Sequence, residues 1–71
     1  MYLKRLKDLR EDNDLKQQDV ANILKIKQQQ YSLYETGKRD LPFELAIILA
    51  KFYNTSLDYI AELTNNKEKY K

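Results

Sequence analysis

Cysteine and histidine are absent from this 71-residue sequence, which also contains only one glycine and one proline. The absence of cysteine excludes disulfides and thiol chemistry and fits a reducing compartment such as the cytoplasm. Without histidine the chain also lacks the commonest general base and, with cysteine missing, the commonest ligands of zinc. The longest apolar run, residues 45–50, is far shorter than the about 20 residues that a membrane span needs. We therefore expect no metal, no cofactor and no membrane span, and the composition argues against an enzyme.

Charge is close to balanced, with 13 basic and 11 acidic residues and a net charge of +2. At 42% apolar and 34% charged, the composition is that of one small globular domain rather than a disordered chain. The positive excess lies in residues 16–39, which contain five lysine or arginine residues against two acidic ones. An excess of this size is compatible with a nucleic-acid partner and equally with scatter over a lysine-rich surface.

Apolar spacing at intervals of three and four residues predicts five short helices with short connections. They cover residues 2–12, 16–24, 28–35, 40–53 and 57–63. Gly37, the single glycine, follows the third helix at the position where a left-handed residue commonly ends a helix. The predicted fold is therefore all-α: a compact five-helix domain over residues 1–64, followed by a polar C-terminal tail, residues 65–71, which we expect to fray.

Residues 15–39 carry a more specific pattern. Gln17 begins the second helix, Ala21 lies inside it, and Tyr-Glu-Thr-Gly-Lys-Arg closes the segment at residues 34–39. In these features the sequence resembles the Cro/CI/XRE-type helix-turn-helix family of phage and bacterial repressors, whose corresponding run is Glu-Asn-Gly-Lys-Arg. Residues 55–58, Thr-Ser-Leu-Asp, resemble the start of that family's fifth helix. The resemblance covers residues 5–63 and implies a lambda-repressor-like DNA-binding domain with its helix-turn-helix at the second and third helices.

The third predicted helix would be the recognition helix. On a helical wheel Tyr31 and Tyr34 point to one side, and the opposite side presents Gln28, Gln29, Ser32 and Leu33. A glutamine amide can hydrogen-bond the N6 and N7 edge of adenine, and a leucine can pack on a thymine methyl group. The resemblance is to lambdoid repressors that use a glutamine pair at this place to read base edges. The same residues would also suit a solvated polar helix face with one exposed leucine, and that interpretation stays open.

Four residues are candidates for phosphate contacts. Gln17 lies at the start of the second helix, where the resemblance implies such a contact and where backbone N–H groups favour an anion. Lys27, Lys38 and Arg39 flank the third helix on both sides. Contacts from these residues would set the register on DNA and raise affinity without reading sequence. Ordinary surface lysines are the alternative.

Arg10 and Glu35 are assigned a structural role. In the family, an arginine of the first helix often pairs with the glutamate of the Glu-Asn-Gly run, and both positions are filled here. The resemblance thus implies a partly buried ion pair that orients the third helix against the first. Lys25 departs from the family, which usually has glycine in this turn. A left-handed lysine there would cost about 1 kcal/mol relative to glycine.

The fourth helix is apolar on two sides. Its expected core face consists of Phe43, Ala46, Ile47, Leu49, Ala50 and Tyr53. Leu45, Ile48 and Phe52 form a second stripe nearly opposite. Because a helix that is apolar on both sides is buried on both sides, the second stripe predicts one of two contacts. It packs against a neighbouring helix of the same chain, or it forms an interface with another subunit, in the first place a two-fold dimer.

Two functions from different classes follow. The favoured one is a sequence-specific transcriptional regulator, in the first instance a repressor, that binds double-stranded DNA as a homodimer on a pseudo-palindromic operator. The alternative is a protein-interaction module on the same fold, such as an antitoxin or a regulatory adaptor. Its protein partner would contact the stripe on the fourth helix, whereas DNA would contact the third helix. The chain could also be the DNA-binding part of a longer regulator.

Overall fold

The helices begin and end close to the predicted positions in a computed structural model that describes residues 2–67. These residues form five helices and no strand. The helices are α1 (Lys4–Asp12), α2 (Gln17–Leu24), α3 (Gln28–Glu35), α4 (Phe43–Phe52) and α5 (Leu57–Ile60). The all-α, five-helix class is therefore confirmed, and α3 has the predicted bounds.

All five helices are followed by a residue in the left-handed conformation. The five residues have φ between +56° and +79° and are Asp14, Lys25, Gly37, Asn54 and Glu62. After α5, the N–H of Glu62 donates to the Tyr59 carbonyl at 3.1 Å. The next N–H, that of Leu63, donates to the Asp58 carbonyl at 2.8 Å. This pair of bonds is a Schellman motif, which turns the chain away from the helix axis. The predicted extension of the fifth helix to residue 63 is therefore wrong.

Gly37 is the one glycine among these helix-ending residues, and two constraints meet there. Its φ of +79° is a conformation that residues with a side chain adopt only with strain. In addition, a Cβ at this position would lie 2.9 Å from the Cα of Tyr2. The close approach of the N-terminal segment to the loop after α3 therefore needs glycine at this position.

The hydrophobic core draws on all five helices. Its largest fully buried side chains are Tyr31, Leu6, Leu9, Leu49, Ile60 and Val20. The prediction that Phe43 lies in the core is wrong, because its side chain is 65% exposed. Phe43 is the first residue of α4, directly after Pro42, and its ring forms one wall of an open pocket in place of a filled interior. Leu49 and Ala50, further along α4, are the residues through which this helix packs into the core.

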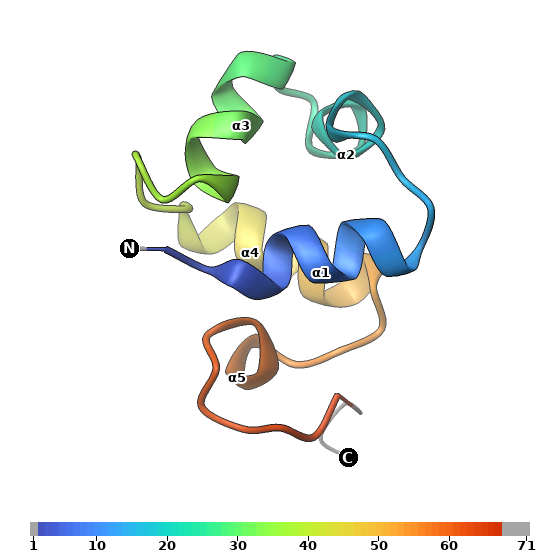
Figure 1. Cartoon of the computed structure of the whole chain (residues 1–71), viewed down its shortest axis with the longest axis vertical. Coiled ribbons are helices and arrows are strands. Elements are labelled where there is room, and N and C mark those ends of the chain that lie inside the picture. The colour runs from blue at the N-terminus through green and yellow to red at the C-terminus, as the bar shows by residue number, and fades with distance from the viewer. Residues whose placement is uncertain (1, 68–71) are drawn as a thin grey trace.

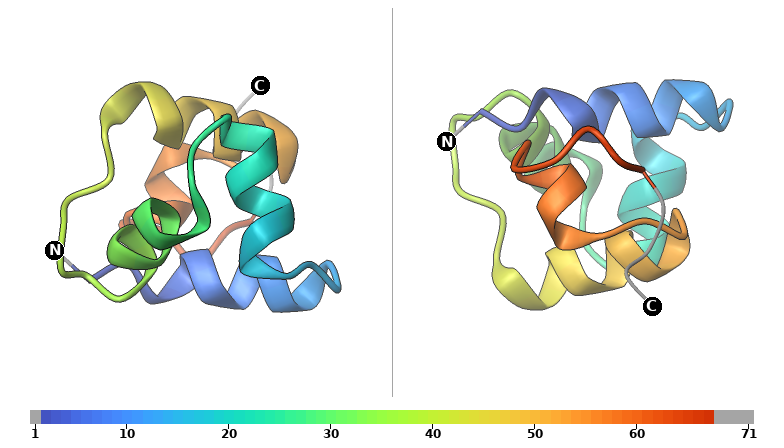
Figure 2. Two further views of the ribbon diagram at one scale, coloured as in Figure 1. Left: turned by 90° about the horizontal axis from the view of Figure 1, so that it is seen from above. Right: turned by 90° about the horizontal axis from the view of Figure 1, so that it is seen from below.

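Helices α1 and α4 form the middle layer of the domain, with α2 and α3 on one side of it and α5 on the other (Figure 1). Helix α1 packs against α3 and α5, and α4 packs against α2 and α5. In Figure 1, α2 and α3 consequently lie above α1 and α4, and α5 lies below them. Figure 2 shows α2 and α3 nearest the viewer when the molecule is seen from above. Among residues 2–67, this arrangement leaves one side of α3, which includes Gln28 and Gln29, exposed. No helix within residues 2–67 has both the length and the hydropathy to cross a membrane.

The segment after α5 folds back along α1. The Arg5 guanidinium lies 4.1 Å from the ring centroid of Tyr59 and donates to the carbonyl oxygens of Tyr59 and Thr64. Further along, Lys67 Nζ lies 3.6 Å from a carboxylate oxygen of Asp12. The first residues of the predicted polar tail, 65–67, therefore lie against the domain, and the remainder of that tail, 68–71, lies outside the described residues.

Candidate nucleic-acid interface

A three-residue turn joins α2 to α3. Lys25, the first residue of the turn, has φ 59° and ψ 41°, which is the left-handed conformation whose cost is weighed above for a lysine in this turn. The N–H of Ile26 donates to the Ala21 carbonyl at 3.0 Å, which closes the end of α2. Lys27 is extended and serves as the N-cap residue of α3. The turn therefore forms without glycine, and Lys25 adopts a left-handed backbone conformation that is unfavourable for a residue with a side chain.

Helix α3 buries one side and presents the other to solvent. Tyr31 is fully buried and Tyr34 is 3% exposed, as the wheel predicted. On the opposite side, Gln28 and Gln29 are exposed, and Ser32 and Leu33, also predicted to contact bases, are half-buried. The structure thus brings the four predicted base-contacting residues onto one outward surface. Their contacts with bases stay a prediction.

A chain of polar contacts connects this surface to the interior. Gln28 Nε2 donates to Gln17 Oε1 at 3.3 Å, and Gln17 Nε2 donates to Glu35 Oε1 at 3.4 Å. The Glu35 carboxylate in turn accepts two hydrogen bonds from Arg10, at 3.0 Å from Nε and 2.9 Å from Nη2. Gln28, the first residue of α3, therefore contacts Gln17 of α2, and Gln17 in turn contacts the buried ion pair between α1 and α3.

The ion pair sets the charge state of this network. Burial by itself would raise the pKa of Glu35, but its polar neighbours, Arg10 foremost and then Tyr31 and Gln17, together outweigh burial and hold the pKa below its usual value. The hydrogen bond from Arg10 to Glu35 correspondingly raises the pKa of the Arg10 guanidinium. Both groups are therefore charged at neutral pH.

Two buried hydroxyl groups accompany the ion pair, and sequence analysis did not anticipate them. Neither Tyr31 Oη nor Tyr53 Oη has a hydrogen-bond partner of normal length and angle among the described residues, although Tyr31 Oη lies close enough to the Glu35 carboxylate for the two groups to shift each other's pKa. Burial, followed by interactions with the Glu35 carboxylate, raises the pKa of Tyr31. Burial raises the pKa of Tyr53 to about 12, against the opposing charge of Arg10. Both phenols therefore stay protonated at any physiological pH.

Basic residues stand at both ends of α3. Lys27 precedes the helix, while Lys38 and Arg39 follow it, and all three are exposed. Gln17, the fourth predicted phosphate contact, is half-buried at the first turn of α2. Cations at these positions place positive charge before and after α3, which suits a polyanion. Within residues 2–67, no group of acidic side chains is placed to hold a metal ion.

The predicted stripe on α4 is divided between core and surface. Leu45 is half-buried and packs against the core, which is the intramolecular contact that the sequence left open. Ile48 and Phe52 remain 40% and 46% exposed. Two of the three residues are therefore available to a partner, and their use as an interface stays a prediction.

Comparison with known proteins identifies the family to which this chain belongs. The family model described as helix-turn-helix matches residues 6–60. The chain belongs to the helix-turn-helix family. This family consists of DNA-binding regulators, not enzymes, and the lambda-repressor-like fold predicted from the sequence agrees with the five helices observed.

Individual relatives extend the match to nearly the whole chain. An uncharacterized HTH-type transcriptional regulator of Bacillus subtilis strain 168, YobD, is 34% identical over 68 residues, covering 96% of this chain and 61% of YobD. The cryptic phage CTXphi transcriptional repressor RstR of Vibrio cholerae is 37% identical over 68 residues, covering 96% of this chain and 59% of RstR. The chain thus spans about three-fifths of the length of the curated relatives it matches. No solved structure matches the chain.

Proposed function

We propose that this chain is a sequence-specific DNA-binding regulator of transcription, acting as a repressor on double-stranded DNA in the bacterial cytoplasm. The observation that carries the proposal is the exposed side of α3, with Gln28 held by Gln17 at 3.3 Å and basic residues at both helix ends. Two relatives are named as a transcriptional regulator and a transcriptional repressor, which supports the same activity here.

Base recognition is assigned to the outward residues of α3. Gln28 and Gln29 occupy the first turn, which is the part of a recognition helix that enters the major groove. Each amide can donate to and accept from the adenine edge at once. Leu33, half-buried beside them, suits a thymine methyl group, and Ser32 suits either hydrogen-bonding partner. The contact from Gln17 limits the rotamers of Gln28 before DNA arrives, which lowers the entropy cost of binding.

Orientation on the duplex is assigned to Gln17, Lys27, Lys38 and Arg39. Gln17 is the first residue of α2, where the positive end of the helix dipole favours a phosphate oxygen. Lys27 and the pair after α3 would meet the backbone on either side of the groove. Such contacts strengthen binding to any sequence and make the affinity dependent on salt.

A homodimer on a pseudo-palindromic site fits the size of the domain. The longest dimension of the molecule is 33 Å. Successive major grooves on one side of B-DNA are about 34 Å apart. The 33 Å axis runs from α2 and α3 towards α5 (Figure 1), so two copies side by side along the duplex take up only 23 or 20 Å each, and a spacing of one helical turn leaves room for both.

Selection of binding sites from a randomised duplex pool at physiological salt tests this proposal. We expect enrichment of one motif with two-fold symmetry. A Gln28→Ala, Gln29→Ala double variant serves as the matched control, because both side chains are exposed and their loss leaves the core intact. The variant should lose the motif while keeping weak binding to random DNA. If the wild-type chain enriches no motif and binds DNA only at low salt, the regulator proposal is wrong.

The second candidate is a protein-interaction module, and the exposure of Ile48 and Phe52 on α4 favours it. In this case a partner protein covers α4 and α3 has no DNA ligand. The selection experiment separates the candidates, since a module of this kind enriches no DNA motif. Ile48→Lys would then abolish partner binding while Gln28→Ala would not.

A further inference from the structure

The connection between α3 and α4, residues 36–42, carries two of the proposed phosphate contacts, Lys38 and Arg39, and both side chains are exposed. The Arg39 N–H donates to the Leu33 carbonyl at 3.1 Å, so the first part of the connection is bonded to the last turns of α3. Ordering a loop at the moment of binding costs free energy, so a loop that is already held in place binds more tightly. The contacts that hold this connection therefore bear on the affinity for DNA.

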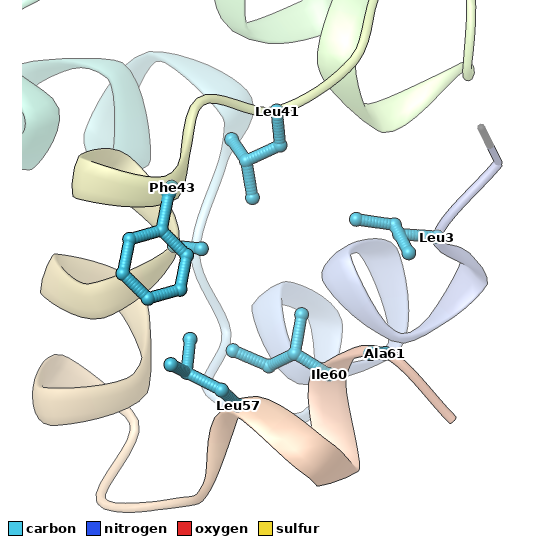
Figure 3. A pocket seen from close by; sticks show the side chains of 7 residues that line it. Leu3, Leu41, Phe43, Leu57, Ile60 and Ala61 are labelled. Atoms are coloured by element: carbon cyan, nitrogen blue, oxygen red, sulfur yellow. The ribbon is translucent and has the colours of Figure 1, made fainter. Parts of the chain in front are cut away.

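The segment before α1 lies against this connection at two places. The first is Gly37, where a Cβ would lie 2.9 Å from the Cα and 3.0 Å from the Cβ of Tyr2, so the two backbones pass each other without room for a side chain. The second is Leu41, which lines the same apolar pocket as Leu3. Figure 3 shows both leucine side chains pointing into this pocket, one from each segment. In both views of Figure 2, the start of α1 and the connection lie together at one edge of the domain.

Lys38 and Arg39 lie between these two contacts in the sequence. We infer that Tyr2 is a positioning residue for DNA binding, which supports the connection so that Lys38 and Arg39 meet the phosphate backbone in a preset arrangement. The inference rests on the proposed function, because it concerns the phosphate contacts assigned there. The support comes from the backbone and the Cβ of Tyr2, since the residue as a whole is 59% exposed.

The sequence pattern did not indicate this contact, because Tyr2 falls inside the first helix that the sequence predicts, residues 2–12. Helix α1 instead begins at Lys4, with Leu3 as its N-cap residue in a non-helical conformation. Residues 2 and 3 therefore lie outside the helix, where they reach the connection. A tyrosine hydroxyl can also contact a phosphate oxygen directly, and the experiment has to separate that role from support of the connection.

Two substitutions at one position test the inference. Tyr2→Gly removes the Cβ that lies against Gly37 and loosens the backbone of the segment. Tyr2→Phe is the matched control, because it keeps the Cβ and the ring and loses only the hydroxyl. Since Tyr2 lies outside the five helices and is mostly exposed, both variants should fold, and circular dichroism checks that they do.

Amide hydrogen exchange of the free protein, followed by NMR, tests the support without DNA. The Arg39 amide, bonded to the Leu33 carbonyl, reports on the connection. The Ile26 amide, bonded to the Ala21 carbonyl in the turn between α2 and α3, is the control for general loosening of the domain. We expect Tyr2→Gly to speed exchange at Arg39 on the order of fivefold and to leave Ile26 unchanged, because the opening is local. Tyr2→Phe should exchange like the wild type.

Fluorescence anisotropy on duplexes of selected and of random sequence provides the second readout. We expect Tyr2→Gly to lower the affinity for both duplexes on the order of tenfold, because each side chain that must be immobilised on binding costs about two- to tenfold. Tyr2→Phe should keep the wild-type affinity. In a Lys38→Ala, Arg39→Ala background, Tyr2→Gly should cause no further loss, since the side chains that it positions are absent.

Three outcomes overturn the inference. They are an unchanged exchange rate at Arg39 in Tyr2→Gly, an equal loss of affinity with and without Lys38 and Arg39, and a loss in Tyr2→Phe as large as that in Tyr2→Gly. The last result would make the hydroxyl itself the contact. Failure of the proposed function is recognised separately. In that case the wild type binds neither duplex at physiological salt, and hydrogen exchange still decides whether Tyr2 supports the connection.

Discussion

Arg10 and Glu35, which lie 25 residues apart in the sequence, form a bidentate ion pair with two hydrogen bonds. The side chains are 13% and 4% exposed, so the pair is largely removed from water. Arg10 also donates to the Leu15 carbonyl at 2.9 Å, which connects the pair to the segment before α2. Since Glu35 is the last residue of α3, this contact determines how the helix-turn-helix sits on α1.

Breaking this pair should be among the most destabilising single changes in the chain. Glu35→Gln leaves the Arg10 charge buried without its counter-ion. We expect a loss of about 3 kcal/mol in the free energy of unfolding. Urea denaturation followed by circular dichroism at neutral pH measures this loss. An Arg10→Met, Glu35→Leu double variant is the control and should lose less stability than the single variants Arg10→Met and Glu35→Leu lose when their effects are added. Additive losses would show that the two groups do not interact.

Acid should weaken the domain through the same carboxylate. The pKa of Glu35 is lower in the folded chain than its usual value, so its stabilising effect is complete above the usual glutamate pKa of about 4.3. The effect is lost as the pH falls through the lower, folded-state pKa. The stability difference between wild type and Glu35→Gln should therefore be constant near neutral pH and shrink below about pH 4. Urea denaturation across this range checks the trend, and a difference that grows on acidification contradicts it.

Alkaline pH should lower the stability of the folded domain through ionisation of the Tyr53 hydroxyl. Its pKa of about 12 exceeds the usual value for tyrosine, so the folded state resists ionisation of this hydroxyl. The corresponding stability is complete below about pH 10 and is lost as the pH rises towards the folded-state pKa. Tyr53→Phe removes a buried hydroxyl that has no hydrogen-bond partner among the described residues. We expect an unchanged or slightly higher thermal midpoint at neutral pH and a smaller loss of stability at alkaline pH. A lower midpoint at neutral pH would show that the hydroxyl is bonded in solution.

The left-handed residues offer a route to higher stability. Lys25 and Glu62 have φ of 59° and 64°, where a side chain is unfavourable. We expect Lys25→Gly and Glu62→Gly each to raise the free energy of unfolding by about 1 kcal/mol. Thermal denaturation measures both. Gly37→Ala is the opposite control and should destabilise, because its Cβ would also collide with Tyr2. A destabilising Lys25→Gly would mean that the gain in unfolded-state entropy outweighs the relieved strain.

Base and phosphate contacts should respond differently to substitution. Gln28→Ala should cost about 1–3 kcal/mol on the selected motif and little on random DNA, because only the motif presents the matching base edge. Lys38→Ala should weaken binding to both kinds of DNA and lower the slope of log affinity against log salt by about one. Fluorescence anisotropy at several salt concentrations measures both quantities. Equal losses on the two DNAs for Gln28→Ala would contradict its base contact.

Structural features that depend on residues close together in the sequence could be predicted from the sequence. The bounds of α3 and the inward side of Tyr31 and Tyr34 follow from helical periodicity, which depends only on spacing along the chain. The left-handed conformation of Gly37 follows from its position after a helix, whereas for Lys25 it is considered because the resembling family usually has glycine in this turn. The partnership of Arg10 with Glu35 came from the family resemblance, since nothing in local spacing relates residues on different helices.

The sequence by itself determined the five helices, the outward polar side of α3 and the family. Only the tertiary structure decided which apolar side of α4 is covered, because that depends on the length and position of α5. The Schellman motif at Glu62 ends α5 at Ile60, and Phe43 then lines an open pocket while Leu45 packs inward. The contact from Gln17 to Gln28 likewise exists only once the turn at Lys25 brings α2 and α3 together. Periodicity specifies which residues share a side of a helix, whereas burial is a property of the neighbour that the side meets.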